Sequence, residues 1–134
     1  MSEPIVFVSH FIVREGRVEE LKLFIDKGAP MLEADKPGTV AFLPYVDQEG
    51  SRASIVHVFP DVEAMDRHFE GSDERSAAAY ELVQPTGFEI YGRPSTAALS
   101  AIRSESEATG VPLEVWPEGM RGFLRLAPGG NDRP

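Results

Sequence analysis

The stretch Ser54-Ile55-Val56-His57-Val58-Phe59-Pro60-Asp61 leads from a strand into a helix and carries one imidazole in a run that is otherwise apolar. β-Branched and aromatic residues predict a strand over 53–59, which Pro60 ends, and Asp61 caps the helix that follows. Both faces of this strand are apolar, because Ile55 and Phe59 lie opposite Val56 and Val58. Strands of this kind belong in a sheet that is covered on both sides.

Two further strands precede this one. Residues 5–13, IVFVSHFIV, are β-branched and aromatic and predict the first strand. Residues 39–46, TVAFLPYV, predict the second, in which Pro44 cannot donate to a ladder and so belongs at an edge, a bulge or a strand end. Residues 47–50 are typical of a hairpin loop, which would pair the second strand with the third.

A helix is predicted between the first two strands. Val18, Leu21 and Ile25 recur at helical spacing, with charged residues between them. Gly28 and Pro30 are expected to bend or interrupt this helix before the turn that leads into the second strand.

The chain after residue 61 predicts a helix in two parts and a fourth strand. The apolar stripe of Val62, Met65 and Phe69 ends at Gly71, after which a new helical turn begins. A turn at 85–87 and a strand at 88–92 are expected next. The order within residues 4–93 is therefore β-α-β-β-α-β, the ferredoxin-like order of an α+β fold.

Residues 95–134 are expected to form a C-terminal extension of the ferredoxin-like domain at 1–94. Ser95 caps a short helix, and the polar residues 104–110 are interpreted as a linker. Two short apolar segments follow in PLEVW and GFLRL, and the last eight residues are expected to fray. The extension packs either on its own domain or on a partner subunit.

The pattern of the first strand predicts a homodimer. Ile5 and Phe7 lie on one face, and Val6 and Val8 lie on the other. Helices on one side would leave an apolar face larger than the few hundred Å² that monomers usually expose. Covering about 800 Å² per subunit is worth roughly tens of kcal/mol before the costs of association. We therefore expect two copies to pack sheet to sheet.

The composition excludes several classes of function. The chain of 134 residues suits one domain. Its net charge of −9, from 13 basic and 22 acidic residues, argues against nucleic acids and anionic membranes as partners. Without cysteine it has no disulfides, thiolate nucleophiles or Cys-ligated metals. No signal peptide or membrane span is recognised, and a cytoplasmic protein is expected.

Three histidines and one tyrosine are candidates for catalytic or ligand-binding roles. His57 is a base if its face points at the helices, and a hydrogen-bonded residue of the subunit seam if it points at a partner. His10 has the same alternatives, with a structural role favoured. His68 lies on the helix stripe, and Tyr80 follows three alanines that leave room for a ligand. No HxH or HxxxH pattern occurs, so no metal is predicted.

Apolar residues around these candidates are expected to hold a substrate. Ser9 would face the pocket if Phe7 and Phe11 face the helices, because all three share one side of the first strand. The expected base and orienting groups are His57, His68 and Tyr80. The expected substrate-binding residues are Phe7, Ser9, Phe42 and Phe59.

Two passages resemble the antibiotic biosynthesis monooxygenase (ABM) superfamily. Lys36-Pro37-Gly38-Thr39 is similar to the acidic-Pro-Gly-small turn that members have before their second strand. Residues 58–65, VFPDVEAM, with His68, are similar to a strand that ends in an aromatic residue, an acid-rich helix start and an "EA…H" pattern. The resemblance covers residues 4–93. It implies a dimeric α/β barrel with pockets between each sheet and its own helices.

The resemblance also implies a protein that handles small molecules. The superfamily includes quinone-forming oxygenases without metal or flavin, haem-degrading enzymes, and members of no known role. Our leading hypothesis is a monooxygenase of aromatic or quinol-type substrates that needs no cofactor. Such an enzyme deprotonates a phenol in a dry pocket with a base and an anion stabiliser, so that the anion reacts with O₂. The alternative is a non-catalytic dimeric ligand-binding or sensing domain.

The chain differs from the superfamily at positions where other members carry their catalytic residues. Many relatives carry Glu where His57 stands. Haem-degrading relatives have Asn, Trp and His where alignment by motif places Ser9, His68 and residues 79–80 of this chain. Haem degradation is therefore not expected, and haem binding without turnover is a third hypothesis.

Overall fold

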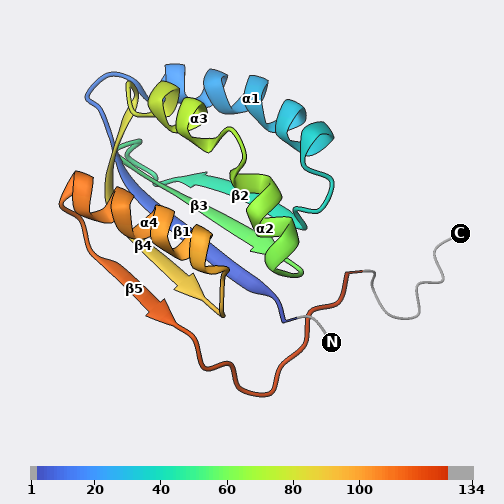
Figure 1. The fold of residues 1–134 in the computed structure, drawn as a ribbon. Helices are drawn as coiled ribbons and strands as arrows, with labels where there is room; N and C mark the ends of the chain where they lie inside the picture. The colour runs from blue at the N-terminus through green and yellow to red at the C-terminus, as the bar shows by residue number, and fades with distance from the viewer. Residues whose placement is uncertain (1–2, 127–134) are drawn as a thin grey trace, which may run out of the picture.

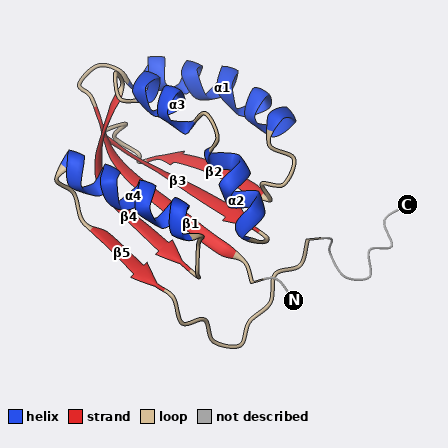
Figure 2. Cartoon of the chain, viewed as in Figure 1, coloured by secondary structure: helices blue, strands red, loops and turns tan. Residues whose placement is uncertain are grey.

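The computed structural model describes residues 3–126, so the expected fraying at the C-terminus lies outside the described residues. The described part contains one five-stranded sheet and four helices, which all cover the same face of the sheet (Figures 1 and 2). The elements are β1 Ile5–Val13, α1 Val18–Asp35, β2 Ala41–Val46, β3 Arg52–Phe59, α2 Val62–Phe69, α3 Ser72–Ala79, β4 Val83–Tyr91, α4 Thr96–Thr109 and β5 Leu113–Trp116. The predicted α+β fold, a ferredoxin-like core followed by a helix and a strand, is confirmed.

The strand order β2-β3-β1-β4-β5 puts the first strand at the centre of the sheet. β1 pairs antiparallel with β3 and β4, and β2 pairs antiparallel with β3. β5 is parallel to β4, because α4 carries the chain back across the helix layer before β5 begins. The sheet of one chain is open and does not close into a barrel. We call its helix-covered side the inner face and its other side the outer face.

The prediction of a turn at residues 85–87 was wrong, because these residues lie inside β4. The pairing register shifts between His10, which faces Gly87, and Phe11, which faces Pro85. This bulge leaves Thr86 as an extra residue on β4 and accommodates a proline that cannot donate to a ladder.

The linker expected at residues 104–110 was also wrong. α4 continues through the polar residues to Thr109 and ends at Gly110, whose φ of 71° suits a left-handed helix cap. Ala98 and Ile102 on the same helix are buried in the core, so α4 is amphipathic, and most residues of the polar run are exposed on its last turns.

α1 is one continuous helix, although Gly28 and Pro30 were expected to bend or interrupt it. Pro30 lies on the exposed side, where water can satisfy the carbonyl that loses its helical partner. The apolar segment 122–126 forms no strand. Its Phe123 is exposed, and the Arg125 guanidinium lies 4.7 Å from the centre of that ring.

Side-chain alternation divides the strands between a core face and a bare face. On the inner face, Ile5, Phe59 and Ile90 are at most 1 % exposed and pack with Met65 of α2. Asp61 caps α2 by accepting a hydrogen bond from the Ala64 N–H at 2.8 Å, which directs that helix onto the sheet. The outer face carries a second apolar set, which includes Val6, Val8, Ile12, Leu43, Val56, Val58, Tyr91 and Trp116.

The buried Met65 side chain tests this packing. Met65→Ala is expected to lower the free energy of unfolding by about 2–5 kcal/mol, because it leaves a cavity under α2. Met31→Ala, at a position 71 % exposed on α1, is the matched control and should change it by less than about 0.5 kcal/mol. Urea unfolding of both variants measures the difference, and equal losses would contradict the placement of α2.

Candidate functional site

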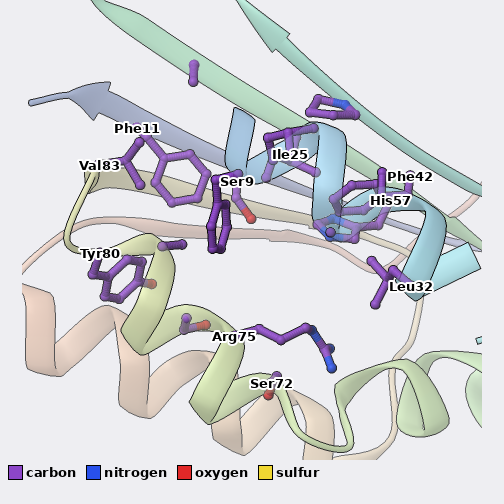
Figure 3. Close-up of a pocket in the computed structure, with 18 of the residues that line it drawn as sticks. Ser9, Phe11, Ile25, Leu32, Phe42, His57, Ser72, Arg75, Tyr80 and Val83 are labelled. Atoms are coloured by element: carbon purple, nitrogen blue, oxygen red, sulfur yellow. The ribbon is translucent and has the colours of Figure 1, made fainter. Parts of the chain in front are cut away.

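A cavity of about 380 Å³ lies between the inner face of the sheet and helices α1, α3 and α4 (Figure 3). Its wall is mostly apolar and aromatic. Of the residues predicted for the site, those that line the cavity are Phe7, Ser9, Phe42, His57, His68 and Tyr80. Phe59 lies beneath it, fully buried, with its ring centre 5.2 Å from that of His68 and 6.0 Å from that of His57.

The strand register explains why these side chains meet. Phe7 of β1 pairs with His57 of β3, which in turn pairs with Phe42 of β2. Paired residues point to the same face of a sheet, so the three rings form one row across it. The Phe7 and His57 rings are stacked with centres 5.2 Å apart. Of the two faces left open by the sequence, His57 therefore occupies the one that faces the helices.

His57 is held as a neutral acceptor. Its Nδ1 lies 3.1 Å from the Phe7 carbonyl oxygen, which can only accept, so Nδ1 carries the hydrogen and Nε2 presents a lone pair. Burial lowers the pKa of His57 to about 4, with the nearby Arg75 charge adding to the effect and the Phe7 hydrogen bond opposing it. The imidazole is therefore uncharged at neutral pH.

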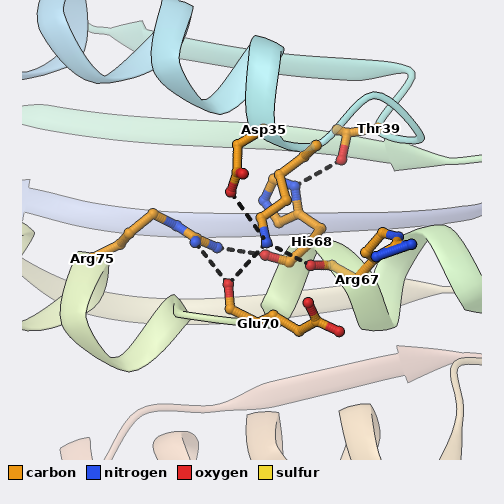
Figure 4. A network of polar contacts seen from close by, with 7 residues as sticks. Asp35, Thr39, Arg67, His68, Glu70 and Arg75 are labelled. Carbon is orange, nitrogen blue, oxygen red and sulfur yellow. Dashed lines mark hydrogen bonds and ion pairs between the residues drawn. The ribbon is translucent and has the colours of Figure 1, made fainter.

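His68 of α2 completes a pair of neutral imidazoles. Its ring centre is 5.2 Å from that of His57, with the two planes near perpendicular at 79°. Its Nδ1 lies 2.8 Å from the Thr39 hydroxyl oxygen, which fixes the ring orientation (Figure 4). Burial lowers the pKa of His68 to about 3, helped by His57 and by the cations Arg75 and Lys36.

The two cations beside the histidines hold the end of α2 (Figure 4). Lys36 is buried, and its Nζ donates to the carbonyl oxygens of Arg67 at 2.8 Å and Glu70 at 3.0 Å. Arg75 of α3 donates to the carbonyl oxygens of His68 and Glu70. Positive charge at the C-terminal carbonyls of a helix is favourable, so these contacts lock α1, α2 and α3 together around the site.

Arg75 also lines the cavity, where Figure 3 shows it reaching toward the histidine end. Its guanidinium has five N–H donors, and the two carbonyls occupy only some of them. It can therefore bind an oxygen of a ligand while it holds α2.

Tyr80 lies at the other end of the cavity, with its ring centre 6.5 Å from that of Phe11. Burial and the neighbouring Glu105 carboxylate raise the pKa of Tyr80 well above its ordinary value. Its hydroxyl is therefore a hydrogen-bond donor rather than a base. Glu105 comes from α4, so the C-terminal extension contributes to the cavity wall.

His10 is separated from the other two histidines. It lies on the outer face, where its Nε2 is 3.0 Å from Glu89 Oε1 and its Nδ1 is 2.8 Å from Ser54 Oγ. Among residues 3–126, no group of three or more histidine, aspartate or glutamate side chains is arranged to hold a metal ion. No helix in the same range is long and apolar enough to cross a membrane. The cytoplasmic location stays a prediction.

Four residues at this site were not predicted from the sequence, and they are Lys36, Thr39, Arg75 and Glu105. Arg75 lies in the polar run SDERS and looks like a solvated helix residue. Glu105 lies in the segment that was interpreted as a linker. For Lys36 and Thr39, their place in the KPGT turn was the available signal, because that turn joins α1 to the strand next to His57.

The fold is similar to that of solved structures, although no family model and no curated protein matches the sequence. MupZ from Pseudomonas fluorescens is 15 % identical, with a TM-score of 0.68 over 91 % of this chain and 96 % of that chain. SnoaB, a cofactor-independent oxygenase from Streptomyces nogalater, is 19 % identical, with a TM-score of 0.57 over 71 % of this chain and 97 % of that chain. A protein from Bacteroides thetaiotaomicron, provisionally described as an antibiotic biosynthesis monooxygenase, is 18 % identical, with a TM-score of 0.54 over 66 % and 85 % of the two chains. Identities this low establish a shared fold, the one that the motifs led us to expect.

The depressed pKa values of the two histidines predict a pH-dependent stability. Unfolded histidines bind protons below about pH 6.5, whereas folded His57 does so only near pH 4, so the free energy of unfolding should fall as the pH drops from 6.5 to 4. His57 alone contributes roughly 3 kcal/mol to this fall, at 1.36 kcal/mol per pKa unit. Urea unfolding of wild type and of His57→Gln between pH 7 and pH 4.5 measures it. The variant should show a shallower dependence, and parallel curves would contradict the neutral buried imidazole.

Proposed function

We propose that this chain, which has the fold of the antibiotic biosynthesis monooxygenase superfamily, is an oxygenase of aromatic or quinol-type substrates that works without a cofactor. The observation that carries the proposal is the apolar cavity with a neutral acceptor, His57 Nε2, beside a guanidinium, Arg75. A phenol hydroxyl matches this pair, because its hydrogen can be accepted by the imidazole while its oxygen accepts from the guanidinium. The shared fold with SnoaB supports the same reaction class.

The proposed reaction begins with the loss of the phenolic proton. The proton moves from the phenol oxygen to His57 Nε2, and the remaining oxyanion is stabilised by Arg75. A base with a pKa of about 4 is weak, so the transfer depends on the oxyanion itself, whose negative charge favours the protonated imidazole.

The electron-rich anion then reacts with O₂. One oxygen atom bonds to a ring carbon and becomes a quinone carbonyl, and the other leaves as water with the two hydrogens that the phenol loses. The substrate supplies all four electrons that O₂ takes up, so the balance needs no external reductant. The residues Phe7, Phe42 and Phe69 provide apolar surface that keeps water away from the anion.

The far end of the cavity sets the orientation of the substrate in this proposal. The Glu105 carboxylate beside Tyr80 can accept a hydrogen bond, so a substrate with a polar group at each end can be held along the cavity. His57 and Tyr80 are joined by β1, which runs from Phe7 to Phe11 beneath them. Four residues of strand span about 13 Å, a length that suits a ring system larger than one phenol.

The outer face is proposed to bind a second copy of the chain. It carries an apolar set across all five strands and is uncovered within residues 3–126. The strands have between 4 and 9 residues, and at about 3.3 Å per residue and 4.8 Å between strands the face spans several hundred Å² in projection. This approaches the roughly 800 Å² per partner of a stable interface. In such a dimer α4 and β5 of the extension remain on their own chain.

A dimeric binding domain without catalysis is the second candidate. The observation that favours it is the low basicity of His57, which suits hydrogen bonding better than proton transfer. Both candidates predict that phenols bind in the cavity, and they differ in whether O₂ is consumed.

Oxygen uptake separates the two candidates. With a panel of phenols and hydroquinones, wild type should consume O₂ at a rate that His57→Ala lowers by about 10²-fold or more, the scale of a general base. Arg75→Met should lower it similarly by removing the anion stabiliser, whereas Arg103→Met on the exposed side of α4 should not. An oxygen electrode measures the rates. Phenol binding, seen by calorimetry, without uptake above the His57→Ala control would leave the binding domain as the function.

The proposed dimer is tested by mass in solution. Light scattering at micromolar concentration should give about twice the chain mass of 14.7 kDa. Val56→Glu places a charge on the outer face and should shift the mass to the monomer. Val62→Glu, on an exposed position at the start of α2, is the control and should leave the dimer intact. A monomeric wild-type protein would contradict the dimer.

A further inference from the structure

A polar bridge crosses the apolar outer face. His10 of β1 lies between two neighbouring strands, with its Nε2 3.0 Å from Glu89 Oε1 of β4 and its Nδ1 2.8 Å from Ser54 Oγ of β3. An ionised carboxylate can only accept, so His10 Nε2 carries a hydrogen whenever Glu89 is charged. Ser54 can donate to Nδ1 or accept from it, so the bridge fits both the neutral and the protonated imidazole.

Apolar residues lie beside the bridge along β1. Val8 and Ile12 flank His10 on the outer face, and Val8 pairs with both Glu89 and Val56. The side chains of His10 and Glu89 are still 41 % and 29 % exposed in the single chain, so water solvates both. A cover over this face would remove that water and leave the pair in an apolar interface.

Other ionisable groups on the outer face add negative charge near the bridge. Glu114 of β5 is the register partner of Glu89, which places two carboxylates on adjacent strands. Tyr91 beside them has its pKa raised by burial and by Glu89 and Glu114, so it stays neutral. Arg52 of β3 forms an ion pair with Asp47 in the hairpin, at 3.4 Å, and Tyr45 of β2 is exposed. The bridge therefore has more negative than positive charge around it when His10 is neutral.

We propose that a second copy of this chain binds the outer face with uptake of a proton by the bridge between His10 and Glu89, so that the dimer is tighter at pH 6 than at pH 8. This rests on the proposed dimer and adds its regulation. A neutral His10 beside Glu89 would bury a net negative charge in each subunit, whereas a protonated His10 buries a neutral pair.

The direction in which pH changes the dissociation constant of the dimer follows from where the proton is bound more tightly. A proton on His10 is favoured more in the dimer than in the monomer, because the Glu89 carboxylate 3.0 Å away has then lost its water, so the dimer gains affinity as the pH falls from 8 to 6. One proton taken up per dimer changes the dissociation constant tenfold per pH unit, since the constant then scales with the free proton concentration. We therefore expect the dissociation constant to rise at least tenfold from pH 6 to pH 8.

The experiment is sedimentation velocity of a fluorescently labelled full chain from nanomolar to micromolar concentration at pH 6, 7 and 8. It is run at high salt, which screens the general repulsion between two chains of net charge −9. His10→Gln and Glu89→Gln replace each ionisable group by a neutral amide that can still hydrogen-bond. Each variant should reduce the change in dissociation constant between pH 6 and pH 8. Glu107→Gln, exposed on α4, is the control and should retain the wild-type change.

The outcomes separate this inference from the proposal on which it rests. A monomer at every pH overturns the dimer and the proton linkage together. A dimer with the same dissociation constant at pH 6 and pH 8 overturns the linkage alone. A pH dependence that both bridge variants retain overturns the assignment to His10 and Glu89, because another group would then bind the proton.

Discussion

Strands that are apolar on both sides impose the constraint from which this architecture follows. Each strand must place one row of side chains under the helices and leave the other row on the outer face. The inner row builds the core around Phe59 and Met65 and lines the cavity above it. The outer row remains uncovered within the described chain, and the polar bridge at His10 interrupts its apolar surface. Core, cavity and proposed interface are therefore consequences of a single side-chain alternation.

The two histidines of the cavity are uncharged, and the positive charge of the site comes from Arg75. His57 and His68 are buried in aromatic surroundings, where a charged imidazole would cost several kcal/mol. The Phe7 carbonyl selects one tautomer of His57, and the Thr39 hydroxyl orients His68. Arg75 supplies positive charge at the edge of the same site, held by the carbonyls at the end of α2. An acceptor without charge beside a fixed cation is suited to a ligand that becomes an anion.

Secondary structure was predicted correctly where it depends on neighbouring residues, and incorrectly where it depends on contacts with distant parts of the chain. The strand 5–13, the cap at Asp61 and the helix from Ser72 were predicted with nearly the observed bounds. Residues 85–87 were misread because Pro-Thr-Gly has turn chemistry, whereas the bulge that absorbs it depends on pairing with His10 and Phe11 of a distant strand. The polar run at 104–110 was misread because its charged residues conceal the side of α4 that packs through Ile102.

The sequence by itself determined the α+β order, the two apolar faces and the grouping of Ser9 with Phe7 and of His57 with Phe59, because alternation along a strand is a local property. Only the tertiary structure decided that these groups face the helices while His10 faces outward. It alone brought Arg75 and Glu105 to the cavity and Thr39 to His68, from separate elements. Alternation fixes which residues share a face, but the choice between faces depends on where the helices pack, and that is settled by contacts between residues far apart in the chain.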